Sequence, residues 1–260
     1  MNTGASPSEN NQIESILKKL HSISSKNALD VATGDGGFIR LLMETLKEYQ
    51  SFTGVDIYQK RLNQAIRKFK RNSVEFLNMN AENLEFEDDS FDLASISESL
   101  HHLKNPVKVL TEIRRVLKKS GFFILQESFS DPDQPEPRIS DVLIHEYIAK
   151  VDVSSSDYHH GFYSRQEMVK MVEEAGFSNN EARISHSPLK CVLCKYADHC
   201  SDSKSKKMIN TGLRAISASL KKARGLSEYD DLKTEATGIR KKVRENGYSP
   251  ASVIFIFAIK

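Results

Sequence analysis

The hydrophobic pattern is clearest between residues 28 and 46, where an apolar run is followed by glycines and then by a helical repeat. Residues 28–32 are apolar apart from Asp30, which predicts a short strand covered on both faces. Gly34 and Gly36 then allow the backbone to turn tightly and to approach a ligand closely. Apolar residues recur at helical spacing from 38 to 46, so the turn is predicted to open a helix whose N-terminus faces that ligand.

The rest of the chain continues this alternation of strands and helices. Apolar and β-rich runs predict further strands at 51–56, 74–77, from 91 onward, at 122–127, at 181–187 and at 249–259. Helical spacing, with a capping box at Ser164, predicts helices at 11–20, 62–69, 106–120, 139–151, 164–175, 204–224 and 228–244. Such alternation predicts an α/β fold with a doubly wound, mainly parallel sheet.

Composition narrows the class of protein. A chain of 260 residues that is 39% hydrophobic can bury one full α/β core with an elaboration. No run approaches the roughly 18 apolar residues of a membrane span, and the polar N-terminus lacks a signal-peptide pattern, so a cytoplasmic protein with no membrane span is expected. A net charge of +2 gives no argument for a nucleic-acid partner, and three cysteines do not suggest a disulfide framework.

An acid at the end of the next strand makes the glycine turn a candidate nucleotide site. Asp56 lies roughly 20 residues beyond the turn, where a carboxylate can accept hydrogen bonds from ribose hydroxyls. The spacing excludes a dinucleotide fingerprint, because the third glycine of G-x-G-x-x-G would fall on Ile39. The pattern present is D-x-A-x-G-x-G, from Asp30 to Gly36.

That pattern resembles motif I of the class I S-adenosylmethionine-dependent methyltransferases, although Ala32 stands where the family usually has glycine. Three more stretches are similar to family motifs and follow in the same order: Asn80-Ala81-Glu82, the strand and turn from 91 to 103, and the helix-to-strand joint from 115 to 127. The likeness is to small-molecule enzymes such as the ubiquinone/menaquinone-biosynthesis group. It implies a Rossmann-like seven-stranded sheet with an antiparallel seventh strand, and methyl transfer from S-adenosylmethionine to a small-molecule acceptor.

Residues that match the family's motifs are the expected cofactor contacts. The resemblance implies that Asp56 contacts the ribose and that Asn80 contacts the adenine amino group, for which the Asn80 side chain offers a carbonyl acceptor. The full expected set is Asp30, Ala32, Thr33, Gly34, Gly36, Asp56, Ile57, Asn80, Ala81 and Ser97.

Residues 1–260 are expected to form one methyltransferase domain with an inserted helical lobe. The resembling family joins its sixth and seventh strands by a tight return, whereas two helical stretches intervene here. Cap elements at 138–152 and 203–246 are therefore expected over the carboxyl ends of the strands, where an open α/β sheet binds ligands. Their apolar faces are expected to close over a largely apolar acceptor; these faces consist of Val142, Leu143, Tyr147, Ile209, Leu213, Ile216 and Leu220.

Methyl transfer from a sulfonium is an in-line displacement, so the protein must chiefly align donor and acceptor and exclude water. A general base is needed only if the acceptor still holds its proton. His101, His102 and His160 are the candidate bases, with turn stabilisation as the alternative role. Glu127, at the end of the fifth strand, is a further candidate for facing the substrate.

A cysteine cluster follows the sixth predicted strand. Cys191, Cys194 and Cys200, with His199 or His186 as a fourth ligand, are residue types that bind zinc. Zinc that orders the lobe is one interpretation, and unligated thiols are the other.

Two rival functions stay open at this level. The segment 204–224 carries seven basic residues and no acid, which would suit tRNA or rRNA as the acceptor, although its charges also fit the solvated back of a helix. A non-catalytic nucleotide-binding protein of the same fold is the other alternative. Neither the acceptor atom nor the oligomeric state follows from the sequence.

Overall fold

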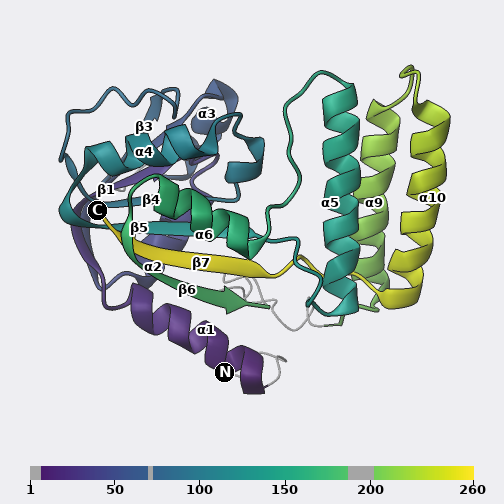
Figure 1. The fold of residues 1–260 in the computed structure, drawn as a ribbon, viewed down its shortest axis with the longest axis horizontal. Coiled ribbons are helices and arrows are strands. Elements are labelled where there is room, and N and C mark those ends of the chain that lie inside the picture. Colours follow the sequence, from purple (N-terminus) through teal and green to yellow (C-terminus); the bar gives the residue numbers. More distant parts are fainter. Residues whose placement is uncertain (1–6, 70–72, 187–201) are drawn as a thin grey trace.

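A seven-stranded sheet forms the centre of the molecule in the computed structural model, which describes residues 7–69, 73–186 and 202–260 (Figure 1). The strand order is β3-β2-β1-β4-β5-β7-β6. β7 runs antiparallel to β5 and β6, and the other neighbouring pairs are parallel. The predicted Rossmann-like sheet with an antiparallel seventh strand is confirmed.

The strands follow the apolar runs closely. They are β1 (Ser24–Val31), β2 (Glu48–Asp56), β3 (Val74–Asn78), β4 (Phe91–Ser97), β5 (Leu117–Ser128), β6 (Ser178–Ser185) and β7 (Val253–Ile259). The helices are α1 (Pro7–Leu20), α2 (Gly37–Thr45), α3 (Gln59–Lys68), η1 (Leu100–His102), α4 (Pro106–Val116), α5 (Glu136–Ser154), α6 (Arg165–Glu174), α9 (Lys206–Lys222) and α10 (Tyr229–Asn246).

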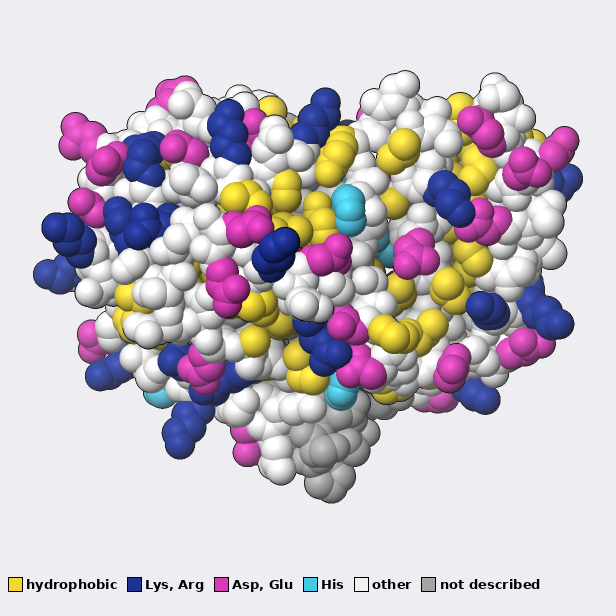
Figure 2. Space-filling view, in the orientation of Figure 1, with side chains coloured by type: hydrophobic (Ala, Val, Ile, Leu, Met, Phe, Trp, Pro, Cys, Tyr) yellow, Lys and Arg dark blue, Asp and Glu magenta, His cyan; other side chains and the backbone are white. Residues whose placement is uncertain are grey.

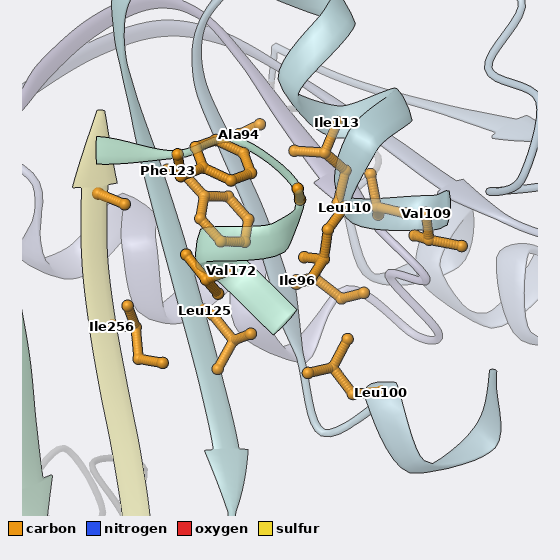
Figure 3. Packing of buried hydrophobic residues seen from close by; sticks show 14 of the residues in the cluster. Ala94, Ile96, Leu100, Val109, Leu110, Ile113, Phe123, Leu125, Val172 and Ile256 are labelled. Atoms are coloured by element: carbon orange, nitrogen blue, oxygen red, sulfur yellow. The ribbon is translucent and has the colours of Figure 1, made fainter. Parts of the chain in front are cut away.

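Two hydrophobic cores hold the helices on the two faces of the sheet. On one face Ile96, Leu125 and Ile256 of the sheet meet the apolar stripe of α4 and Val172 of α6 (Figure 3). On the other face the apolar sides of α1 and α2 pack on the sheet. Burial of apolar surface stabilises a fold by roughly 25 cal/mol per Å². The helices on both faces therefore hold the strands, and with them the strand ends on which the site is built, in place.

Two element boundaries differ from the sequence prediction. The helix begun by Pro106 ends at Val116 rather than at Ser120, because β5 already starts at Leu117 and pairs with Phe91 of β4. α5 begins at Glu136 rather than at the predicted residue 139, with Pro137 in its first turn where its missing N–H costs nothing. The capping box at Ser164 is confirmed, since the Ser164 and Glu167 side chains each bind the other residue's backbone N–H.

α5, α9 and α10 stand side by side beyond the carboxyl ends of the parallel strands (Figure 1). The expectation that their apolar faces close over an acceptor is wrong. Tyr147 and Ile216 are fully buried in a third core that the three helices form with one another, and Leu143, Ile209, Leu213 and Leu220 pack against it. The three helices are amphipathic and lie beyond the sheet, so they bury their apolar stripes against one another. The other side of α5 then faces the strand ends.

Candidate functional site

The turn after β1 has left-handed backbone at three positions, 32, 34 and 36, which favours glycine at each. Gly34 has a φ of 56° and Ala32 a φ of 54°, both in the left-handed region. The Thr33 N–H donates to the Val55 carbonyl (2.9 Å) and the Gly36 N–H donates to the Thr33 carbonyl (2.9 Å). The turn is therefore tied to β2 and delivers the chain into α2. The glycine that the resembling family carries at position 32 has a physical reason here, because alanine must adopt an unfavourable φ.

Asp30 lies beneath this turn. It is 1% exposed, and its carboxylate accepts hydrogen bonds from the hydroxyls of Thr33 (2.6 Å) and Ser95 (2.7 Å). Burial raises the pKa of Asp30 to about 6, although the two hydrogen bonds oppose the rise. Asp30 and Thr33, both expected cofactor contacts, are thus placed where they hold the turn rather than where they meet open space.

Asp56 closes the turn from the end of β2. One carboxylate oxygen accepts the Gly34 N–H (2.8 Å) and the other accepts the Tyr58 N–H (2.7 Å). Directly beside it, Ile57 is 60% exposed and Tyr58 is 67% exposed, an apolar surface that no packing in the described chain explains. Asn80 is exposed after β3, and its side-chain carbonyl accepts the Glu82 N–H (2.9 Å) and has a second lone pair for another donor.

These residues fit the adenosyl group that the resemblance implies. A carboxylate offers about four lone-pair sites, so Asp56 can accept ribose hydroxyls in addition to its two backbone partners. The exposed Ile57 and Tyr58 side chains offer an apolar surface to a flat base, and Ala81 follows Asn80 at the same edge of the sheet.

A cavity of about 850 Å³ connects the start of α2 with the strand ends and with α5. From the sheet it is lined by Ser97, Glu98, His101, Gln126 and Ser128. From the other side it is lined by Asp141 and His145 of α5, by Phe162, and by the approach to β7 from Tyr248 to Val253. Ser97, an expected contact, therefore lies where the glycine turn and this cavity meet.

Glu98 follows β4 with a φ of 45°, an unusual conformation for a residue with a side chain. The residue is exposed to the cavity, while its carboxylate lies among protein atoms and accepts the Ser128 hydroxyl (3.1 Å). Burial of the carboxyl group raises the pKa of Glu98 to about 7, and the negative charge of Glu127 is the second cause of the rise. A carboxyl group with this pKa can accept a proton near neutral pH.

Glu127, at the end of β5, is 1% exposed and organises the turn after β4. One carboxylate oxygen accepts the N–H groups of Ser99 (2.9 Å) and Leu100 (2.8 Å), and the other lies 2.9 Å from His101 Nδ1. Burial alone would lower the pKa of His101, but the hydrogen bond and charge of Glu127, with Glu98 beyond, raise it. Glu127 is a buried anchor for His101 and does not line the cavity.

The three predicted histidines have different positions. His101 is buried and lines the cavity. His102 is exposed with its ring 4.2 Å from that of His101, and the surrounding protein, then His101 and His159, lower its pKa to about 3. His160 is exposed, and its ring stacks on Tyr163 at 4.1 Å. Of the adjacent pair, the structure brings His159 rather than His160 to the cluster around His101.

Two histidines of this cluster were missed or passed over in the sequence. His145 projects from α5, and its Nε2 lies 3.2 Å from His159 Nε2. His159 is 5% exposed and its Nδ1 lies 2.8 Å from Asp152. His145 and Asp152 lie seven residues apart on one helix, a same-face spacing that could have drawn attention to them.

The cysteine cluster cannot be placed. Cys191, Cys194, His199 and Cys200 fall within 187–201, outside the described residues. No helix in residues 7–69, 73–186 and 202–260 combines the length and the apolarity needed to cross a bilayer.

Known proteins are similar to this chain in sequence and in fold. A family model described as a methyltransferase domain matches residues 29–125. A demethylmenaquinone methyltransferase of Lactiplantibacillus plantarum is 28% identical over 63% of this chain and 75% of its own. A ubiquinone/menaquinone biosynthesis C-methyltransferase of Brucella canis is 31% identical over 58% of this chain and 61% of its own. The crystal structure of a putative methyltransferase from Bacillus halodurans superposes with a TM-score of 0.57 at 19% identity, covering 95% of this chain and 97% of the other.

Proposed function

The chain belongs to the class I S-adenosylmethionine-dependent methyltransferases, and on that premise we propose that it methylates a small hydroxylated aromatic acceptor of the quinol class. The support for this class is twofold. Relatives named for demethylmenaquinone and ubiquinone/menaquinone methylation match 63% and 58% of this chain. The cavity beyond the glycine turn offers an aromatic wall, Phe162 with His145, and polar groups on the opposite side.

The cofactor half of the site would be held by the turn and by the ends of β2 and β3. Asp56 would accept the ribose hydroxyls, Ile57 and Tyr58 would cover the base, and Asn80 would meet its amino group. S-adenosylmethionine supplies, when bound, an electrophilic methyl group on a positively charged sulfur. The chain's own contribution is to hold donor and acceptor in line and to keep water away.

Glu98 is the residue we assign to the acceptor's proton. It faces the cavity at the end of β4, and its pKa of about 7 lets a useful fraction be ionised at neutral pH. Loss of a phenolic proton to Glu98 raises the electron density on the oxygen and on the ring carbons beside it, which are the atoms that take a methyl group. This cavity-facing carboxylate is the single observation on which the acid–base part of the proposal rests.

The direct test is transfer of radiolabelled methyl groups to a reduced, short-chain demethylmenaquinone-type quinol, with tRNA as a rival acceptor. Glu98→Gln is expected to lower kcat by roughly 10²-fold or more and to leave S-adenosylmethionine affinity unchanged. Glu44→Gln is the matched control, because Glu44 lines the same cavity from the last turn of α2 rather than from the end of a strand. Labelling of tRNA but not of the quinol would replace the acceptor class, and no transfer to any acceptor by a protein that binds the cofactor would favour the non-catalytic alternative.

Calorimetry tests the cofactor half separately. Asp56→Ala is expected to weaken S-adenosylmethionine binding by about 1.5–3 kcal/mol, because a charged acceptor is removed from the ribose and the Gly34 amide loses its partner. Unchanged affinity in a variant with wild-type circular dichroism would remove Asp56 from the cofactor site.

A further inference from the structure

Three imidazoles converge where the sheet edge meets the helical lobe. His101 comes from the turn after β4, His145 from α5 and His159 from the loop after α5. One nitrogen from each residue lies within 4.8 Å of the other two. Histidine side chains are visible at this junction of the two parts of the molecule (Figure 2). Three separate elements thus bring one ligand type to one point.

Two of the three imidazoles have a carboxylate behind them. His101 Nδ1 lies 2.9 Å from Glu127, and His159 Nδ1 lies 2.8 Å from Asp152. In the neutral imidazole each Nδ1–H can then donate a hydrogen bond to its carboxylate, which leaves Nε2 with its lone pair. Metal-binding histidines are held in this way, with the second nitrogen donating to a carboxylate that fixes both tautomer and orientation.

The His145 and His159 nitrogens that face each other must share a proton or a cation, because two lone pairs at this distance repel each other. Their Nε2 atoms are 3.2 Å apart, and Asp152 already fixes the His159 proton on Nδ1. Either His145 donates its own proton across the gap, or a cation takes the place of that proton. Two nitrogens bound to one tetrahedral zinc ion at about 2.0–2.1 Å lie roughly 3.3–3.4 Å apart, so this pair is already spaced as zinc ligands are.

The surroundings suit a site that is open on one side. Phe162 stacks on the His145 ring at 3.6 Å and meets the His101 ring edge-on at 5.4 Å, which limits the rotation of both. His101 and His145 both line the cavity. The Nδ1 atom of His145 is buried and finds no hydrogen-bond partner among the described residues. Three histidines with a fourth position directed to a cavity is the donor set of a catalytic rather than a structural zinc site.

We propose that His101, His145 and His159 bind one divalent metal ion of the zinc class, whose open coordination position faces the cavity. Imidazole nitrogens suit zinc and its neighbours among the later first-row metals, and they disfavour magnesium and calcium. Binding of the ion does not depend on the proposed function. Its use does rest on that function: the open position would take an oxygen of the acceptor and, as a Lewis acid, ease loss of its proton to Glu98.

The cysteine cluster must be separated from this site in any test. The starting protein is therefore the full chain with Cys191, Cys194 and Cys200 replaced by serine. Stripped of metal and titrated with zinc, it is expected to bind about one ion per chain. With cobalt(II) it should show the visible absorption of a four-coordinate nitrogen and oxygen site. Failure of this full-length protein to bind zinc or cobalt would overturn the proposal.

Single variants then assign the ligands. His145→Ala and His159→Ala are each expected to weaken zinc binding by at least 100-fold, whereas His160→Ala is the matched control and should bind as the parent does. Asp152→Asn should weaken binding by about 10–100-fold. Asp152 also pairs with Lys222 (2.9 Å), so Lys222→Met serves as its control and should retain the affinity. Parental affinity in both His145→Ala and His159→Ala would contradict the assignment.

Calorimetry with S-adenosylmethionine on the same variants shows whether each is folded and whether the cofactor half works. If a histidine variant fails to fold, the cobalt spectrum of the parent still tests the donor set. If the cysteine-free parent protein binds zinc but transfers no methyl group, only the proposed function is rejected. If it binds no zinc but transfers methyl groups at full rate, only the metal site is rejected.

Discussion

At the scale of single residues, Ala32 has the least favourable backbone conformation in the turn after β1. Its φ of 54° costs an alanine roughly 1–2 kcal/mol, whereas glycine adopts it freely. Glycine gives back about 0.4–1 kcal/mol through the greater entropy of the unfolded chain. We therefore expect Ala32→Gly to raise the free energy of unfolding by about 0.5–1 kcal/mol, as measured by urea denaturation, with cofactor affinity unchanged. A clear loss of stability would mean that the Ala32 methyl group makes compensating contacts.

Asp30 makes stability depend on pH. Burial raises its pKa from 3.8 to about 6 in the folded state, so the folded protein binds a proton that the unfolded chain has released over this range. The protonated Asp30 carboxyl group therefore contributes to the free energy of unfolding. This contribution is fully present below pH 3.8 and is lost as the pH rises through 6. Relative to Asp30→Asn, which cannot ionise, the wild type should lose on the order of 3 kcal/mol between pH 4 and pH 7.

The measurement is the difference in unfolding free energy between wild type and Asp30→Asn at several pH values, which cancels the titration of all other groups. Asparagine keeps a hydrogen-bonding partner for both Thr33 and Ser95, so the turn should survive the change. A difference that does not vary with pH would show that Asp30 titrates normally.

At the scale of elements, the sequence specified what depends on local pattern. The glycine turn and the strand that ends at Asp56 follow from apolar runs and turn residues, whereas the seven-stranded sheet with its antiparallel seventh strand followed from the family resemblance. The lobe's apolar faces were assigned to the wrong partner, because periodicity shows which side of a helix is buried but not against what. His145 was missed for a similar reason: its importance comes from His101 and His159, which only the tertiary fold brings close.

The packing of the lobe can be tested at two glycines in its helices. A Cβ on Gly212 of α9 would lie 2.8 Å from the Tyr248 ring and 3.1 Å from Ile144, whereas one on Gly238 of α10 would meet nothing within 4 Å. Gly212→Ala should therefore destabilise the protein by about 1–3 kcal/mol through overpacking. Gly238→Ala is the matched control and should stabilise it by roughly 0.5–1 kcal/mol, since alanine loses less entropy in a helix. Equal effects in thermal or urea denaturation would mean that α9 does not pack closely on Tyr248.

At the scale of the whole molecule, two layers of core hold the sheet and a separate core holds the lobe. α5 connects the two parts. Its Asp141 accepts hydrogen bonds from the Tyr248 hydroxyl (2.8 Å) and from the Ala251 N–H (2.8 Å), just before β7 begins. The residues proposed to bind the cofactor lie at the ends of β1 to β4 and in the turns after them, whereas α5 separates the sheet from α9 and α10 (Figure 1). A ligand at the strand ends can stabilise the lobe through α5 and through the segment between α10 and β7, which both line the cavity.

This arrangement predicts an uneven response to S-adenosylmethionine in hydrogen exchange. At 100 times its dissociation constant the cofactor should stabilise the part that binds it by roughly 2.7 kcal/mol, which slows exchange in β1, β2 and the start of α2. Amides of α9 and α10 that exchange by opening of the lobe alone should change much less. Zinc added afterwards should slow exchange in α5, because His145 and His159 would then be tied to His101 at the sheet edge. If the cofactor alone protects the sheet and α9–α10 equally, the two parts unfold as one cooperative unit and the lobe has no independent opening.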